Sequence, residues 1–181
     1  MDINDVLLEN RIIYINGEIN GNLASYVIQR LLYLDSISHE DISLYINSAG
    51  GGVIDGLAII DCMNILKSSV ATICVGCAYS MAAIILASGT IGKRYSLLHS
   101  EIMLHEPFSN GVLGKESDIK ISLNRVNKYK ESLIEILISK TKKNRKEIER
   151  QLNFDNFLNP MEARKIGIID KVIKGGDEDE N

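Results

Sequence analysis

The chain has 181 residues, of which 45% are hydrophobic, and its 20 Lys/Arg and 24 Asp/Glu give a formal net charge of −4. This size fits a single domain, 1–181, that buries most of its apolar side chains. The four acids at 177–180 account for the net charge, so the body is neutral and shows no long basic face, which argues against nucleic acid as a partner.

Targeting and redox signals point to the cytoplasm. The stretch 68–92 has no charged residue, but glycines and hydroxyl side chains interrupt it, so it predicts no membrane span. The first five residues are acidic and do not resemble a signal peptide. Cys62, Cys74 and Cys77 are odd in number and lie in predicted core elements, which favours a reducing cytosol over a disulfide framework.

Three units of strand, turn and helix open the chain. Short apolar runs rich in β-branched residues predict the strands, and apolar residues at helical spacing predict the helices. This alternation predicts an α/β fold with largely parallel strand pairing. The expected strands are 11–16, 42–46 and 70–75, and the expected helices are 22–34, 57–66 and 81–87.

A run of glycines, Gly50 to Gly52, follows the second strand. It matches neither of the glycine patterns that bind nucleotide phosphates, so nucleotide binding is disfavoured. Two interpretations remain open at this point. The run is a plain tight turn, or it lets backbone N–H groups approach a bound peptide or the carbonyl under attack.

Ser80 lies where the third strand becomes a helix. A hydroxyl at that place is near unpaired backbone N–H groups and the positive end of the helix dipole, which suits a nucleophile. The competing interpretation is an ordinary N-cap serine, since Ser is a preferred cap residue. Cys77 is a rival nucleophile, but without a lowered pKa it would stay a thiol.

His105 is the candidate base, because it ends a predicted strand at 102–107, whereas His99 lies in a polar turn and His39 in a solvated loop. Beyond it, apolar residues recur at helical spacing from 118 to 138. This pattern predicts a long amphipathic helix that projects from the body.

Two helix starts are predicted near the C-terminus, at Asn144 with Glu147 and at Asn159 with Glu162. Between them, Asp155 is flanked by Phe154 and Phe157, which we expect to draw the loop onto the body and partly bury the acid. Asp170, by contrast, is expected to be solvated, and an ordinary turn role for Asp155 stays open. The acidic tail, 175–181, is expected to be disordered.

Four motifs together resemble the ClpP family, the proteolytic subunits of the ATP-dependent Clp proteases. They occur in the family order and extend the resemblance from about residue 6 to 174. Several motifs at compatible spacing are far more specific than any one. They are SLYINSAGG at 43–51, GCAYSM at 76–81, MLHEP at 103–107 and DNFL at 155–158.

The resemblance implies a crotonase-like fold of repeated β-β-α turns with a projecting handle helix, and a Ser-His-Asp serine endopeptidase. It implies Ser80 as nucleophile, His105 as base and later acid, and Asp155 as the residue that orients the histidine. The N–H groups of Gly51 and Met81 would form the oxyanion hole. No cofactor or metal is expected on this chain.

The resemblance also implies partners. Family members form two stacked seven-membered rings around a chamber and receive unfolded chains from a hexameric AAA+ ATPase. ATP is therefore the cofactor of that partner. Unfolded proteins and short peptides would be the substrates of the homo-oligomer, and no membrane partner is expected.

Several positions depart from the family pattern. Only about ten residues precede Arg11, Ala49 replaces a proline, Tyr79 replaces a small residue, and Ser109-Asn110 replaces paired glycines. The short segment before Arg11 affects the expectation of ATPase docking. Tyr79 affects the expected shape of the substrate pocket. An alternative is therefore a weakly active or inert ring subunit that is the structural partner of a paralogue in a mixed ring. A crotonase-like acyl-CoA hydratase is disfavoured, because its acid-base glutamates have no counterpart.

Overall fold

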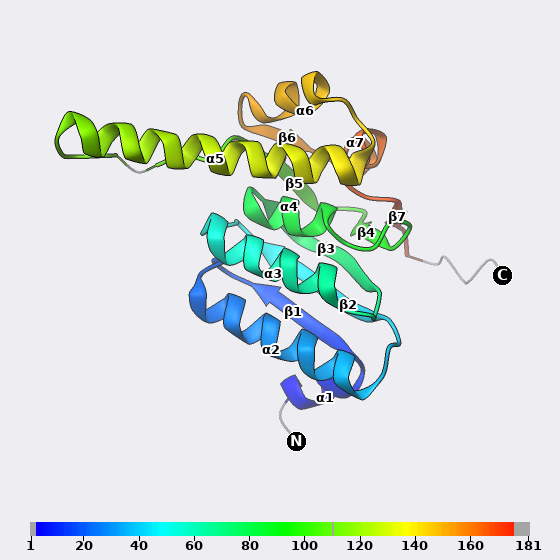
Figure 1. Ribbon diagram of the computed structural model, residues 1–181. Helices are drawn as coiled ribbons and strands as arrows, with labels where there is room; N and C mark the ends of the chain where they lie inside the picture. The colour runs from blue at the N-terminus through cyan, green and yellow to red at the C-terminus, as the bar shows by residue number, and fades with distance from the viewer. Residues whose placement is uncertain (1–2, 110, 176–181) are drawn as a thin grey trace.

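The computed structural model describes residues 3–109 and 111–175. Its first half contains three parallel strands, each followed by a helix, as predicted (Figure 1). A short helix that was not predicted, α1 (Ile3–Glu9), precedes them. The three units are β1 (Ile12–Asn16) with α2 (Gly21–Ile37), β2 (Ile42–Ser48) with α3 (Val53–Ile65), and β3 (Val70–Tyr79) with α4 (Met81–Ala87).

Strand β3 is longer than predicted because it pairs with two different strands. Its first half, Thr72 to Cys74, pairs with β4 (Arg94–Leu97). Its last three residues, Cys77 to Tyr79, pair instead with β5 (Glu101–Leu104). Gly76 lies between the two halves with φ +86°, in the left-handed region that favours glycine. The strand can therefore change partners just before Ser80.

The sheet is parallel except at one edge. Its main path runs β1-β2-β3-β4-β7, where β7 is Lys171–Ile173. From β3 a branch leads through β5 to β6 (Asn156–Leu158), which is antiparallel to β5. The predicted α/β class with largely parallel pairing is thus confirmed, and the branch brings the segment around Asp155 to the C-terminal end of β3.

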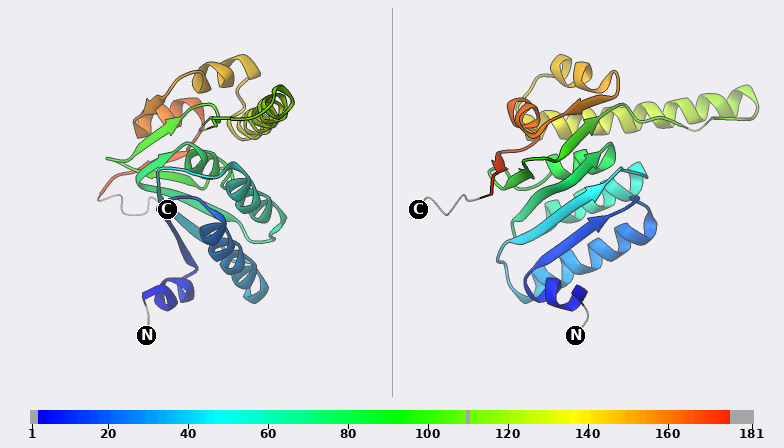
Figure 2. Two further views of the ribbon diagram at one scale, coloured as in Figure 1. Left: turned by 90° about the vertical axis from the view of Figure 1, so that its left-hand side faces the viewer. Right: turned by 180° about the vertical axis from the view of Figure 1, so that it is seen from behind.

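The core lies between the sheet and the helices α2, α3 and α4, which cover the same face of it (Figures 1 and 2). All seven residues of α4 are buried, so this helix packs on every side. Alternate residues of β2 are buried, from Ile42 to Ser48. Because α4 is buried along its whole length, its first turn is held in place. Ser80 directly precedes that turn.

The long helix α5 (Glu116–Thr141) projects beyond the body, as predicted (Figure 2). Its 26 residues correspond to roughly 39 Å at 1.5 Å per residue. Only its C-terminal part is buried, at Leu133, Ile134, Leu137 and Thr141. The N-terminal part exposes Ile119, Ile121 and Leu123.

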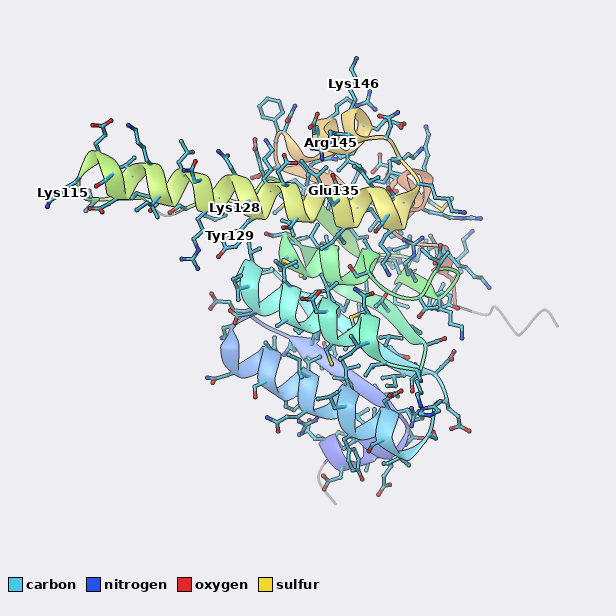
Figure 3. All side chains as sticks on the ribbon, in the orientation of Figure 1. Lys115, Lys128, Tyr129, Glu135, Arg145 and Lys146 are labelled. Atoms are coloured by element: carbon cyan, nitrogen blue, oxygen red, sulfur yellow. The ribbon has the colours of Figure 1, made fainter. Side chains whose placement is uncertain are left out.

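Two predicted capping boxes are confirmed. Asn144 and Glu147 cap α6 (Arg145–Leu152), and Asn159 and Glu162 cap α7 (Pro160–Ile166). Helix α6 also contacts the C-terminal half of α5: Arg145 lies 2.9 Å from Glu131 and also pairs with Glu135 (Figure 3).

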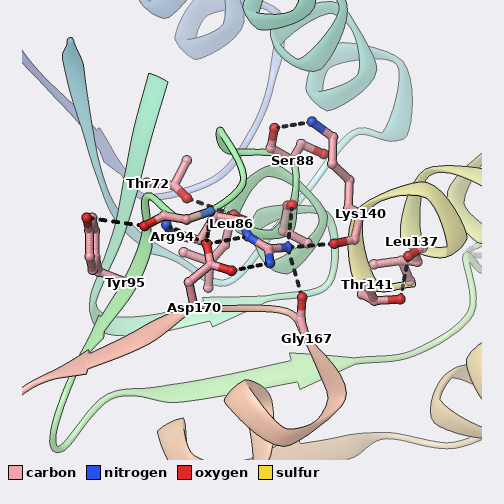
Figure 4. Close-up of polar contacts among 12 residues, drawn as sticks. Thr72, Leu86, Ser88, Arg94, Tyr95, Leu137, Lys140, Thr141, Gly167 and Asp170 are labelled. Carbon is pink, nitrogen blue, oxygen red and sulfur yellow. Dashed lines mark hydrogen bonds and ion pairs between the residues drawn. The ribbon is translucent and has the colours of Figure 1, made fainter. Parts of the chain in front are cut away.

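A buried ion pair joins the C-terminal elements to the sheet (Figure 4). Arg94 on β4 is 4% exposed in its side chain and contacts Asp170 at 2.6 Å. Its guanidinium also donates to the carbonyls of Ala87, Lys140 and Gly167, at the ends of α4, α5 and α7. The prediction that Asp170 is solvated was therefore wrong, because its partner lies 76 positions away in the sequence.

Among residues 3–109 and 111–175, none of the helices is both long enough and apolar enough to span a membrane. In the same part of the chain, no cluster of three His, Cys, Asp or Glu side chains is arranged to hold a metal ion. The predicted disorder at 175–181 falls almost wholly outside the described residues.

Candidate active site

Ser80 lies between β3 and α4, as predicted, but its side chain does not cap the helix. Its backbone has φ 53° and ψ −124°, a conformation that non-glycine residues rarely adopt. Such strain costs on the order of 1–3 kcal/mol and persists only where the surroundings enforce it. The interpretation of Ser80 as an ordinary cap was therefore wrong: the hydroxyl points elsewhere.

The Ser80 hydroxyl meets His105. The distance from Ser80 Oγ to His105 Nε2 is 2.8 Å. His105 follows β5, and this strand is held against the end of β3, where Ser80 N–H donates to the carbonyl of Met103 at 2.8 Å. The imidazole is 15% exposed and packs edge-on against the Phe108 ring, with centroids 5.5 Å apart.

Asp155 lies on the other side of the imidazole. Its Oδ1 is 3.2 Å from His105 Nδ1, and it enters from the loop between α6 and β6. The carboxylate is 67% exposed, and Phe154 and Phe157 are 83% and 53% exposed. The prediction that these aromatic rings partly bury the acid was wrong, because both rings are themselves largely exposed and the antiparallel pairing of β6 with β5 positions the loop.

The predicted oxyanion hole consists of the backbone N–H groups of Gly51 and Met81. Met81 is the first residue of α4, so its N–H has no acceptor within the helix. Gly51 pairs with Ile19 in an isolated parallel bridge, in which Ile19 bonds to Gly50 and Gly52. In such a bridge the middle residue points its own N–H away from the partner strand. The Gly51 N–H is thus directed away from Ile19.

The glycine run is needed for close packing. A Cβ on Gly50 would lie 2.7 Å from the Tyr79 carbonyl oxygen and 2.8 Å from Ser80 Cβ. A Cβ on Gly51 would lie 2.2 Å from the Ile19 carbonyl oxygen. The run is therefore more than a plain tight turn, because Gly50 packs directly against the Ser80 turn and Gly51 against Ile19.

A cavity of about 480 Å³ opens at this place. A larger cavity, of about 630 Å³, lies between α1 and α2, and none of the predicted site residues line it. Size alone therefore does not identify the site. The smaller cavity is lined by Glu18, Ala49, Gly50, Gly51, Ser80, Met103, His105 and Phe108.

The rival nucleophile is poorly placed for that role. Burial raises the pKa of Cys77, and its Sγ lies 3.5 Å from the Asn47 side-chain oxygen. Burial also raises the pKa of Cys74, to about 11. A raised pKa keeps a thiol protonated and unreactive. His39 and His99 are exposed and lie outside the cavity that contains Ser80.

Sequence reasoning missed two contributors to the site. The Met103 carbonyl anchors the Ser80 backbone, and the Phe108 ring packs on His105. The sequence near these residues predicted neither contact. A backbone carbonyl has no sequence signature, and Phe108 lies in an irregular segment.

A serine, a histidine and an acid in contact form the arrangement found in serine hydrolases on several unrelated folds. The comparison with protein families is more specific. A family model described as Clp protease matches residues 1–176. The chain belongs to the Clp protease family, and it is a ClpP-type peptidase with the ClpP fold. Membership also indicates a ring-forming subunit that works with Clp ATPases.

Proposed function

We propose that the chain is a serine endopeptidase, with Ser80 as nucleophile, His105 as general base and later acid, and Asp155 as the residue that orients the imidazole. One observation carries the proposal: Ser80 Oγ lies 2.8 Å from His105 Nε2, whose other ring nitrogen faces Asp155 at 3.2 Å. A base within hydrogen-bond reach of the hydroxyl is the geometric requirement for activating it.

The reaction begins when Ser80 Oγ attacks a peptide carbonyl and its proton moves to His105 Nε2. Asp155 accepts the Nδ1–H hydrogen bond, which fixes the tautomer and stabilises the imidazolium. The N–H groups of Gly51 and Met81 donate to the oxyanion of the tetrahedral intermediate. The intermediate expels the amine, which takes the proton from His105. Water then hydrolyses the acyl-enzyme by the same route in reverse.

The proposal includes the setting of the reaction. Two stacked heptameric rings would enclose the sites in a chamber in the cytoplasm, and a hexameric Clp AAA+ ATPase would deliver unfolded polypeptides. ATP would be used by that partner, and this chain would bind no cofactor. The exposed apolar residues on the projecting part of α5 are consistent with contacts between subunits.

The direct test is labelling of Ser80 by a fluorophosphonate probe, together with hydrolysis of a fluorogenic peptide by the purified oligomer. We expect Ser80→Ala to abolish labelling and to lower peptide hydrolysis by about 10⁴-fold or more. Ser68→Ala is the matched control, since Ser68 bonds to Asp35 far from the cavity. Unchanged hydrolysis in Ser80→Ala would refute the proposal.

A second candidate is a ring subunit with weak activity alone that acts mainly as the structural partner of a paralogue. The exposure of Asp155 favours it, because a 67% exposed carboxylate holds a histidine less firmly than a buried one. Native mass measurement and peptide hydrolysis, with the chain alone and mixed with a paralogue, separate the two. Strong hydrolysis by a homo-oligomer would exclude the second candidate.

A further inference from the structure

Tyr79, the residue before Ser80, makes two side-chain contacts that the proposed reaction does not use. Its hydroxyl donates to Glu101 Oε1 at 2.5 Å. Its ring meets the Phe157 ring edge-on, with centroids 5.8 Å apart. The hydrogen bond to Glu101, with a further effect of burial, raises the pKa of Tyr79 to about 12. The hydroxyl therefore remains a donor throughout the physiological pH range.

These contacts join the three strands that deliver the site residues. Tyr79 ends β3, just before Ser80, and Glu101 begins β5, which leads to His105. Phe157 lies in β6, two positions after Asp155. In the sheet, Tyr79 is opposite Met103, which is in turn opposite Phe157. Residues two apart in a strand share a face, so Glu101 lies on the face of Met103 and of its neighbours.

The Ser80 turn needs such support because its backbone is strained, with φ 53°. Strained residues persist where the surrounding structure over-determines them. The Ser80 N–H donates to the Met103 carbonyl, and Gly50 packs against the turn. The Tyr79 side chain supplies a third constraint, and its bond to a carboxylate belongs to the stronger class of hydrogen bonds.

We propose that Tyr79, through its hydrogen bond to Glu101, is a positioning residue that holds the Ser80 turn so that Oγ is directed at His105. This inference rests on the proposed function. Tyr79 does not line the cavity that contains Ser80, so it acts through its neighbour and does not contact the substrate in that cavity. Loss of the bond lets the turn relax and lowers the fraction of molecules with Oγ aligned.

The test uses the full-length oligomer and the variants Tyr79→Phe, Glu101→Ala, Glu101→Gln and Tyr79→Phe/Glu101→Ala. Tyr79→Phe keeps the ring beside Phe157 and removes only the donor. We expect it to lower kcat, and the rate of Ser80 labelling by a fluorophosphonate, about three- to tenfold, with KM changed less than about twofold. Glu101→Gln keeps an acceptor and should retain most of the wild-type kcat.

The double variant should be no slower than the slower single variant, because both changes remove the same bond. Tyr95→Phe is the matched control: Tyr95 is a half-buried tyrosine on β4, and its hydroxyl makes only a 3.5 Å contact to the Gly92 carbonyl. Wild-type kcat and labelling in Tyr79→Phe, or additive losses in the double variant, would overturn the inference. Activity that survives Ser80→Ala would instead overturn the proposed function, so the two failures are distinguishable.

Discussion

Two of the pairs that aspartates form with basic side chains, Asp170 with Arg94 and Asp155 with His105, have opposite surroundings. Asp170 and Arg94 are largely buried, at 21% and 4% exposure, and Arg94 is also bonded to three carbonyls. Asp155 and His105 lie at a cavity, and Asp155 is 67% exposed. A buried, fully bonded pair holds elements together, whereas an accessible histidine with one nitrogen on an acid and the other on a hydroxyl can move a proton. The first pair should therefore govern stability and the second activity.

The largest effect should come from Asp155→Ala. Removing the carboxylate leaves the His105 tautomer unfixed, and we expect kcat/KM for a fluorogenic peptide to fall about 10³- to 10⁴-fold. The melting temperature should barely change, because the side chain is exposed. Asp61→Ala, at an exposed acid on α3, is the control for charge. A stability loss as large as that of an Arg94 variant would remove the contrast between the pairs.

Arg94→Met should have the largest effect on stability. It leaves Asp170 buried without its partner and removes the bonds to the ends of three helices, so we expect the free energy of unfolding to fall by about 3–5 kcal/mol. Urea denaturation at fixed protein concentration measures this. The double variant Arg94→Met/Asp170→Asn should recover part of the loss, because the unpaired charge is gone. A change below about 1 kcal/mol in Arg94→Met would show that the pair is not structural.

Gly50→Ala should affect both properties. The added Cβ would lie 2.8 Å from Ser80 Cβ, and φ is +95°, so the Ser80 turn must shift. We expect hydrolysis to fall about 100-fold and stability by about 1–3 kcal/mol. Gly17→Ala is the matched control: its φ is +83°, but its Cβ would meet nothing within 4 Å. Equal losses of hydrolysis in both variants would mean that strain, and not the contact with Ser80, is responsible.

The smallest effect concerns pH. Burial alone would raise the pKa of Asp170, but the hydrogen bonds and charge of Arg94 outweigh it and lower that pKa. A lowered folded-state pKa contributes stability above the unfolded value of about 3.9, and this stability is lost as pH falls through the folded value. The stability difference between wild type and Asp170→Asn should thus be constant near neutral pH and narrow below about pH 4. A stability difference between wild type and Asp170→Asn that grows as the pH falls would contradict a lowered pKa of Asp170.

Much of the architecture could be predicted, because its signals are local. The strand and helix periods, and the capping pairs at Asn144 and Asn159, lie within short windows of sequence. Helix α4 was predicted with the bounds it has, Met81–Ala87. Helix α1 was missed because its residues are only partly apolar and none is buried.

Two of the errors concerned the burial of the acids Asp155 and Asp170. Neighbouring phenylalanines suggested a partly buried Asp155, and the neighbouring Lys171 suggested a solvated Asp170. The residues next to each aspartate in the sequence did not determine how exposed its side chain is. Asp170 is mostly buried because Arg94, 76 positions away, reaches it from the adjacent strand. Asp155 is exposed because Phe154 and Phe157 are largely exposed themselves, and the pairing of β6 with β5 sets where their segment lies.

The sequence by itself determined the alternation of strands and helices, the glycine run and the place of Ser80 between a strand and a helix, since each depends on residues close together in the chain. Only the tertiary structure decided that the Ser80 hydroxyl faces His105 and not its own helix, and that Tyr79 is fastened to Glu101. These contacts span 25 and 22 positions and arise from the change of partner along β3. The physical reason is that a strained turn is set by what packs around it, and that packing is assembled from distant segments.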